Sequence, residues 1–366
     1  MMQRRTFLAA GLAALTGAAV LGWRAWPQGR QPIVLSARDN AAGEHFAVAY
    51  TLAGERVFAT QVKERCHDIC MHPSLPLAVF TGRRPSTESY LIDVQTGRLV
   101  QTFSTPSNRH FQGHAVFDAS GERLYSTEND TDEPGRGVIG VWRLNVSKSL
   151  EREMELSSHG VGPHQLLWLP DGETLVIANG GIRTESGSRA ELNLDAMEPS
   201  LVLMNTQGEC LSKEVLADSM NSIRHLAVAS DGTVIAVQQY QGSLHERIDL
   251  LAIKRPQQPF MVFPVAEAQR SQMQQYAASV AIHDELRLVA MTAPRGSRVF
   301  IWDLDTAQLR LDAPFPDCAG VAASQDGFVV TTGVGRCRSY DCRTQDISMQ
   351  TLQLPAGLWD NHALLA

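Results

Sequence analysis

The 366-residue sequence predicts an all-β fold, a seven-bladed β-propeller of the WD-repeat or quinoprotein-like kind, from three observations. An apolar strand pattern, a turn and a second apolar strand recur at spacings of 41 to 61 residues, which is typical of four-stranded blades. The apolar runs have strand length and are rich in β-branched and aromatic residues, without the 3.6-residue period of helices. The chain ends on one isolated copy of the first-strand pattern.

Six repeats follow the same order of elements. A first strand leads through an Asp-Gly turn or its equivalent into a second, and a third apolar run then ends near Asp or Asn, as in residues 90–93. A fourth strand follows, such as residues 99–103. The best helical candidate is residues 266–278, which we interpret as an insertion between blades. The first strands of the six repeats start at His67, His114, His164, His225, Ser279 and Gly320.

The seventh blade is predicted to combine both ends of the chain. Residues 359–366 repeat the first-strand pattern and then stop, whereas residues 33–37, 45–50 and 56–62 form three strands with no first strand before them. A C-terminal strand that completes an N-terminal blade would close the ring and remove exposed sheet edges. We therefore expect residues 28–366 to form a single propeller domain.

Residues 1–27 are predicted to be an export segment. Gln3-Arg-Arg-Thr-Phe-Leu precedes a mildly apolar stretch without acidic residues, and this pattern resembles a twin-arginine (Tat) signal. An ordinary secretory signal or a membrane anchor is the alternative. The expected location is the periplasm, either released or tethered to the inner membrane by an uncleaved N-terminus.

The charge of the chain excludes some partners. The formal net charge is −7, and the three arginines of the export segment leave 29 basic and 39 acidic residues in the rest. Nucleic acids and anionic membranes need clustered Lys and Arg, so we expect neither as a partner, and we expect a monomer. Six cysteines would enter an oxidising compartment, but the sequence does not select a disulfide pairing, and half-buried strand cysteines are the favoured interpretation.

Histidine recurs at one position of the repeat, the start of the first strand, and we call this set of positions the column. Because first strands start on the same face of a propeller, these side chains are expected to gather at one mouth of the channel. Imidazoles suit iron, copper, nickel or zinc, so the column predicts a metal site, with iron or copper as the expected ion. Hydrogen bonding between blades, with no ion, is the structural alternative. The predicted ligands are His67, His114, His164, His225 and His362.

Two further expectations concern the same face. Ligands from opposite blades of a seven-fold ring are expected to lie too far apart to share one ion, which favours two or three neighbouring histidines. Loops after the second strands should reach this face and supply accessory groups, namely Arg84, Glu128, Asp130 and Arg189. The sequence contains no nucleophile elbow, phosphate-binding loop or His-Glu-x-x-His motif, so no catalytic residue is assigned.

Six motifs of the chain together indicate a family: Tyr125-Ser-Thr-Glu-Asn-Asp, Gly137-Val-Ile-Gly-Val-Trp, Gly160-Val-Gly-Pro-His, Leu192-Asn-Leu-Asp-Ala-Met-Glu-Pro-Ser-Leu, Ile223-Arg-His and Trp359-Asp-Asn-His. They resemble a bacterial family of Tat-exported seven-bladed propeller proteins that carries a domain of unknown function. The resemblance covers nearly all of the chain after residue 27. It implies a place beside imelysin-like and di-haem oxidoreductase-like periplasmic proteins in iron uptake, and it supplies no catalytic residues.

Three functions remain open at this point. The first is a periplasmic protein that binds or hands over a metal, with iron favoured, through the histidines. The second is a scaffold for proteins of a periplasmic iron-uptake system. The third is an enzyme of the lactonase or quinoprotein kind, which fold analogy alone suggests. A binding protein is favoured over an enzyme.

Overall fold

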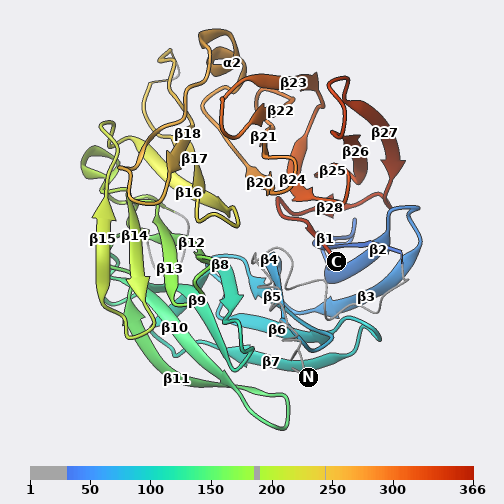
Figure 1. Ribbon diagram of the computed structural model, residues 1–366. Coiled ribbons are helices and arrows are strands. Elements are labelled where there is room, and N and C mark those ends of the chain that lie inside the picture. The colour runs from blue at the N-terminus through green and yellow to red at the C-terminus, as the bar shows by residue number, and fades with distance from the viewer. Residues whose placement is uncertain (1–30, 185–189, 244) are drawn as a thin grey trace, which may run out of the picture.

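The computed structural model describes residues 31–184, 190–243 and 245–366, which form seven β-sheets arranged in a ring (Figure 1). The predicted seven-bladed β-propeller is therefore confirmed. The predicted export segment, residues 1–27, lies outside the described residues. Within these three ranges, no helix is long and apolar enough to cross a membrane.

Each blade is an antiparallel sheet; in six of them the strands run in sequence order from the channel outward, and in blade 1 the C-terminal strands are innermost. Blade 1 holds β1 (Ile33–Asp39), β2 (His45–Thr51), β3 (Arg56–Val62), β28 (Leu358–Trp359) and β29 (Leu364–Leu365). Blade 2 holds β4 (Cys66–Met71), β5 (Leu77–Gly82), β6 (Glu88–Asp93) and β7 (Leu99–Ser104). Blade 3 holds β8 (Arg109–Phe117), β9 (Arg123–Asp130), β10 (Gly137–Leu144) and β11 (Leu150–Ser157).

The remaining four blades follow the same plan around the ring. Blade 4 holds β12 (Pro163–Trp168), β13 (Thr174–Asn179), β14 (Ser200–Asn205) and β15 (Cys210–Glu214). Blade 5 holds β16 (Asn221–Val228), β17 (Val234–Tyr240), β18 (Leu251–Lys254) and β19 (Met261–Val262). Blade 6 holds β20 (Ser279–His283), β21 (Leu288–Ala293), β22 (Arg298–Asp303) and β23 (Leu309–Pro314). Blade 7 holds β24 (Cys318–Ala323), β25 (Gly327–Thr332), β26 (Arg336–Asp341) and β27 (Ser348–Gln353).

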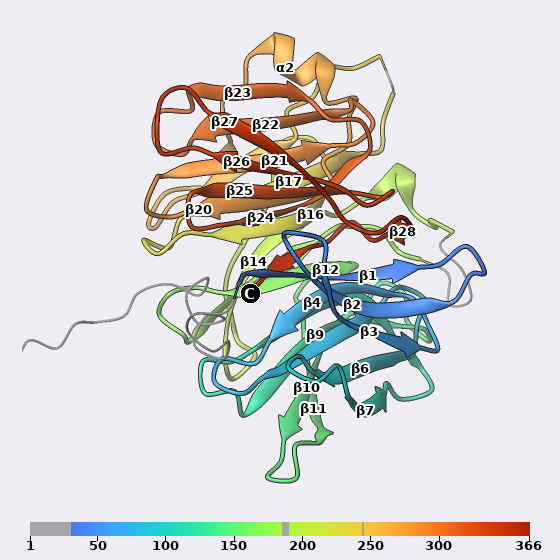
Figure 2. The ribbon, with the colours of Figure 1, turned by 90° about the vertical axis from the view of Figure 1, so that its right-hand side faces the viewer.

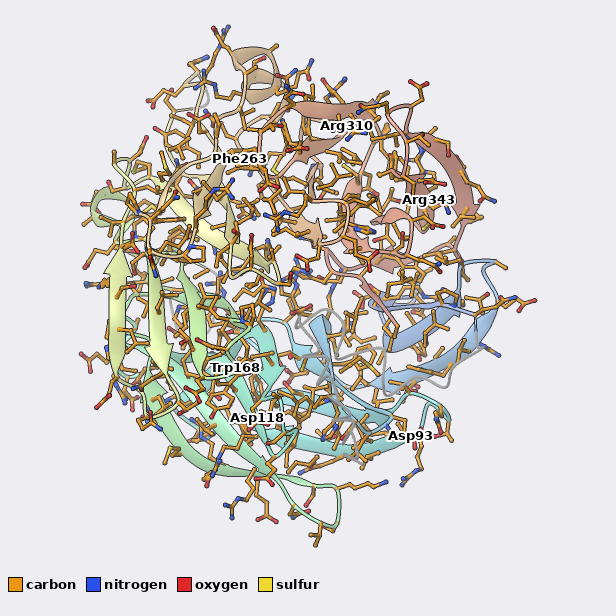
Figure 3. The ribbon with its side chains drawn as sticks, in the orientation of Figure 1. Asp93, Asp118, Trp168, Phe263, Arg310 and Arg343 are labelled. Carbon is orange, nitrogen blue, oxygen red and sulfur yellow. The ribbon has the colours of Figure 1, made fainter. Side chains whose placement is uncertain are left out.

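Seven apolar clusters hold the ring together, and each lies between two neighbouring blades. Second strands such as β5 and β13 are buried along their whole length because a blade covers each of their faces, so their sequences are almost continuously apolar. Fourth strands such as β27 are mostly exposed and polar. Figure 3 shows this gradient, with Trp168 and Phe263 among the blades and Arg310 and Arg343 toward the rim.

Ring closure occurs as predicted, with the C-terminal residues paired to β1. Trp359 opposes Arg38, and Leu365 opposes Val34, so the two ends of the chain share blade 1 (Figure 2). The indole of Trp359 is only 3% exposed and belongs to the apolar cluster between blades 1 and 7. The seventh interface therefore depends on the last residues of the chain.

The expected insertion and the cysteines also have clear places. The helical candidate contains α2 (Glu267–Gln272), shorter than residues 266–278, between blades 5 and 6. The other helical segment of the described residues is one 3-10 turn, η2 (Leu194–Ala196). All six cysteines are unpaired, and four of them are buried. Burial raises the pKa of the Cys337 thiol to about 12, which makes it a packing residue rather than a nucleophile.

The closing strand gives a direct stability prediction. Trp359→Ala should lower the free energy of unfolding by about 3–5 kcal/mol, as other buried aromatic truncations do. The matched control is Leu358→Ala, because Leu358 is 55% exposed and should change stability by about 0.5 kcal/mol or less. Urea denaturation of both variants measures the difference, and equal effects would contradict the role given to Trp359.

Candidate metal centre

The histidines of the repeat column lie at irregularities of the inner strands. Register shifts fall between Cys66 and Ile69 in β4, between Phe111 and Ala115 in β8, and between Pro163 and Gln165 in β12. Another shift falls immediately before His225 in β16. A β-bulge turns the strand and redirects a side chain that regular pairing would aim at a neighbouring blade. Histidine and bulge therefore act together to direct imidazoles into the channel.

Four imidazoles converge there and form what we call the histidine cluster: His67, His114, His225 and His362. One nitrogen of each lies within 4.8 Å of one nitrogen of every other. The Nε2 atoms of His225 and His362 are 3.1 Å apart. All four residues are buried, with exposed fractions of 8% or less. The cluster is thus shielded from solvent by the surrounding blades.

The cluster joins blades 1, 2, 3 and 5, so one part of the sequence-based prediction is wrong. We expected opposite blades to be too far apart to share a ligand, yet His225 contacts His362 across the channel. The bulges and the length of the imidazole side chain bridge the channel. His362 lies between β28 and β29, where Ser36 Oγ donates a 2.6 Å hydrogen bond to its carbonyl oxygen. Ring closure therefore delivers one of the four imidazoles.

Two carboxylates orient the rings, of which Asp360 is buried while the side chain of Asp68 is 18% exposed. Asp360 Oδ1 lies 2.6 Å from Nδ1 of His67, and Asp68 Oδ2 lies 2.8 Å from Nδ1 of His114. With an ionised carboxylate as acceptor, each Nδ1 carries the proton and donates, which leaves the Nε2 lone pair for a ligand. Metal-bound histidines in proteins are commonly held by carboxylates in this way.

Different neighbours keep the two carboxylates ionised, arginines and His67 at Asp360 and histidines at Asp68. Asp360 accepts from Arg65 Nε at 2.9 Å and pairs with Arg83 at 3.4 Å. Although burial works against ionisation, His67 and the two arginines hold the pKa of Asp360 far below its ordinary value. Burial likewise opposes ionisation of Asp68, but His114 and His362 outweigh it and bring the pKa of Asp68 to about 2.

Three imidazoles of the cluster, those of His67, His225 and His362, are neutral at neutral pH because their pKa values are lowered. Burial lowers the pKa of His362 to about 3, against the opposing effect of Asp68. Burial also lowers the pKa of His67, and it lowers those of His164 and His225 strongly, with neighbouring histidines adding to the effect. Only a neutral imidazole can donate a lone pair to a metal ion.

The donor set fits a transition-metal ion. Nε2 of His114 is buried and has no hydrogen-bond partner among the described residues. A buried polar atom left in this state costs about 1–3 kcal/mol, so such atoms point to a ligand. Nitrogens bound to one tetrahedral ion at about 2.0–2.1 Å lie about 3.3 Å apart, close to the 3.1 Å between His225 and His362.

His164, the fifth residue of the predicted column, lies at the edge of the histidine cluster. Its ring centroid is 4.7 Å from that of His225 and 4.9 Å from that of His114. Its nitrogens do not belong to the group of four, and its side chain is more exposed than theirs. The other two column positions carry no imidazole. At Gly320, a side chain would meet Ala363 of the closing segment at 3.0 Å.

The predicted accessory acids serve other contacts. Glu128 accepts from Arg152 Nη1 at 2.6 and 2.8 Å, and Asp130 pairs with Arg109 at 3.0 Å and Arg136 at 2.9 Å. Their carboxylates are therefore committed to arginines of blade 3 and its loops. Arg84 is the neighbour of Arg83, which reaches Asp360, while Arg189 lies outside the described residues.

Sequence reasoning missed the residues that orient the cluster. Asp68 follows His67 directly, and Asp360 stands two residues before His362, so their proximity in sequence was the available signal. Gly113 was also missed. It has a φ of +109°, and a methyl group at this position would lie 2.5 Å from Cδ2 of His67. Its lack of a side chain lets the bulge of β8 pack on the ring.

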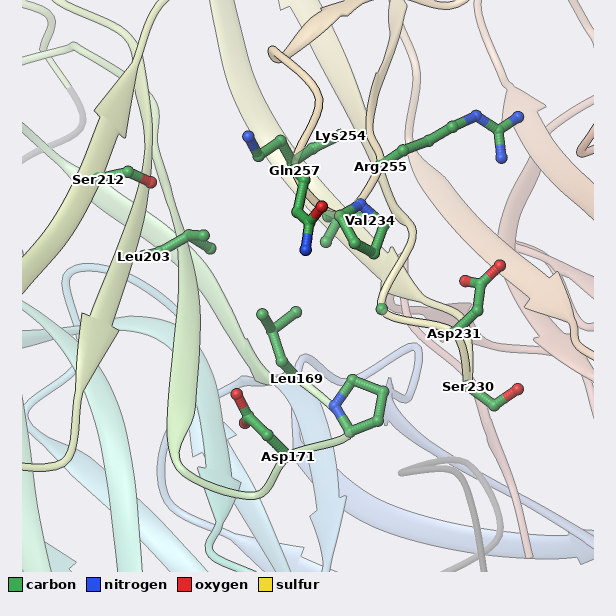
Figure 4. A pocket seen from close by; sticks show the side chains of 13 residues that line it. Leu169, Asp171, Leu203, Ser212, Ser230, Asp231, Val234, Lys254, Arg255 and Gln257 are labelled. Atoms are coloured by element: carbon green, nitrogen blue, oxygen red, sulfur yellow. The ribbon is translucent and has the colours of Figure 1, made fainter.

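A separate pocket of about 460 Å³ lies between blades 4 and 5 (Figure 4). It is lined by turns that follow β12 and β16, which puts it at the opposite ends of these strands from His164 and His225. Its charged groups are already paired, since Lys254 binds Glu214 at 2.6 Å and Asp231 binds Arg287 at 2.9 Å. The histidine cluster is the stronger candidate site.

Fold and site together define a closed seven-bladed propeller with a buried histidine cluster on its axis. The chain belongs to the family described as "Protein of unknown function (DUF1513)", whose model matches residues 60–366. No curated protein matches the sequence. Among solved structures, hydrazine synthase of Kuenenia stuttgartiensis is similar, with a TM-score of 0.59 and 13% identity over 86% of this chain and 94% of that chain. At this identity the similarity supports the propeller fold alone.

The lowered histidine pKa values predict acid sensitivity of the metal-free protein. Below pH 6.5, the ordinary pKa of histidine, the unfolded chain binds protons on histidines that stay neutral in the folded protein. The free energy of unfolding is therefore highest above pH 6.5 and decreases as the pH is lowered. Each such histidine contributes up to about 1.4 kcal/mol per pH unit. Urea denaturation between pH 7 and pH 5 should show this slope, and His362→Gln should reduce it. A flat profile, or the same slope in the variant, would contradict these shifts.

Proposed function

We propose that this protein binds a divalent transition-metal ion in the histidine cluster. The observation that carries the proposal is the convergence of four buried imidazoles within 4.8 Å, with unpartnered nitrogens among them. Among the four rings of the histidine cluster, a hydrogen bond joins only one pair, His225 with His362. An ion would bind one nitrogen of each of the four rings.

Imidazole ligands suit iron, copper, nickel and zinc, and they do not suit magnesium or calcium. We favour iron, because the resemblance in the sequence motifs implies iron uptake, and copper is the second candidate. When bound, the ion supplies an electron-accepting centre. His67 and His114 fix its position through Asp360 and Asp68, and burial keeps bulk water away.

The same burial favours holding the ion over rapid transfer. All ligands are 8% exposed or less, and one of them comes from the segment that closes the ring. We propose a periplasmic location after Tat export, and imelysin-like or di-haem oxidoreductase-like proteins as the partners that supply or receive the ion. These extensions rest on the sequence motifs and the export segment.

Metal analysis tests the proposal. Protein exported by its own N-terminal segment should carry about one equivalent of metal, and His225→Asn should lose more than about 100-fold in affinity, beyond the loss typical of second-shell changes. His159→Asn is the matched control, because His159 bonds Gly208 outside the cluster and should bind metal like the wild type. Equal, substoichiometric metal in all three proteins would exclude the site.

The orienting carboxylate gives a second prediction. Asp68→Asn keeps the shape of the side chain but removes the charge that fixes the tautomer of His114, so metal affinity should fall about 10- to 100-fold. Competition with a chromophoric chelator measures this. Asp171→Asn, in the turn after β12, serves as the control and should leave affinity unchanged. An unchanged affinity in Asp68→Asn would show that the carboxylate plays no part in binding.

A further inference from the structure

The histidine at the edge of the cluster is more accessible than the four that compose it. His164 is half-buried, whereas the four residues of the histidine cluster are buried, with exposed fractions of 8% or less. An ion bound by those four rings is shielded from bulk water, so it needs a route by which it enters and leaves. His164 is the imidazole of the column that lies between solvent and the cluster.

Hydrogen bonds to both neighbouring blades fix the backbone of His164. The fully buried hydroxyl of Thr127 lies 3.1 Å from the carbonyl oxygen of His164 and 3.2 Å from that of His114. On the other side, the side-chain oxygen of Gln165 accepts a 2.6 Å hydrogen bond from the backbone N–H of Leu226 in β16. The start of β12 is therefore held between blades 3 and 5, which both supply a ring to the cluster.

The ring of His164 lies against two rings of the cluster. Its centroid is 4.7 Å from that of His225 and 4.9 Å from that of His114, and it is 6.3 Å from that of His67. Nδ1 of His164 is buried and has no hydrogen-bond partner in the described ranges. Carboxylates hold the rings of His67 and His114, whereas this nitrogen of His164 is left for a ligand.

Three imidazoles are enough for a metal position that exchanges its ligands. A zinc ion with three protein ligands keeps a fourth position open to water, whereas four protein ligands close the site. His164, His114 and His225 offer a site of the first kind at the edge of the cluster. The histidine cluster itself, with four imidazoles, is a site of the second kind.

We infer that His164 is the entry ligand of the histidine cluster, a transient position through which hydrated divalent ions reach and leave the four buried imidazoles. This inference rests on the proposed metal binding. The ion exchanges one water for a nitrogen of His164, and then further waters for nitrogens of His114 and His225. Its bond to His164 breaks as His67 and His362 complete the set of four, and the charge of the ion does not change. Release follows the reverse order.

The rates of Co(II) exchange test this inference. Stopped-flow absorption at pH 7 follows the uptake of Co(II), and mixing the loaded protein with excess EDTA measures its release. His164→Asn should slow both uptake and release by roughly 10-fold or more, because the barrier rises when the ion loses a ligand on its route. The affinity, which is the ratio of the two rate constants, should stay unchanged, since His164 does not bind the ion in its final position.

Three further variants serve as controls. His164→Cys, measured in a reducing buffer, supplies another metal donor and should restore much of both rates, a rescue that a merely structural role of His164 would not give. His164→Gln replaces the asparagine variant if that variant folds poorly. His159→Asn changes a histidine that bonds Gly208 outside the cluster, so it should match the wild type in both rates.

The outcomes separate the two proposals. If the wild type takes up no Co(II), the proposed metal binding fails, and this inference fails with it. If Co(II) binds and His164→Asn changes neither rate, metal binding stands and the entry role is overturned. Faster exchange in this variant would show that His164 obstructs the route. Faster release with unchanged uptake would make His164 a permanent ligand, and either of these results also overturns the inference.

Discussion

The pairing of the C-terminal residues with β1 is the constraint on which the rest of the structure depends. It completes blade 1, places Trp359 in the seventh apolar interface and removes the open edges of the ring. The same segment carries Asp360 and His362 into the channel. A chain that has not closed its ring therefore lacks one imidazole of the histidine cluster and the carboxylate that orients another. Fold completion and site completion are one event in this protein.

The first strands also show how a repeat of apolar strands comes to place histidines in the channel. Regular first strands would direct their side chains into the interfaces between blades, where the repeat needs apolar residues. Bulges at β4, β8, β12 and β16 interrupt that pattern and turn polar residues inward. Blade 6 keeps a regular first strand with Ser279, and Gly320 in blade 7 makes room for the closing segment. The histidines are consequently confined to one side of the ring and its closure.

Repeat spacing, strand composition and the isolated C-terminal strand pattern were sufficient to predict the ring and its closure. The pattern of apolar residues predicts these strands well because a neighbouring blade covers each of their two faces. The same signals did not reveal that His225 would reach His362, because a bulge is a matter of register that the pattern of apolar residues does not encode. Asp68, Asp360 and Arg65 were missed because ionic contacts leave no period in the sequence, and only the folded chain brings these residues to the histidines.

The central claim is that the four imidazoles hold one metal ion. Anomalous diffraction from crystals of the metal-loaded protein, measured at the absorption edge of the metal, tests it most directly. We predict one strong peak on the channel axis, about 2.0–2.1 Å from one nitrogen each of His67, His114, His225 and His362. A channel without a peak in protein that carries stoichiometric metal, or a peak bound by surface groups, would contradict the account.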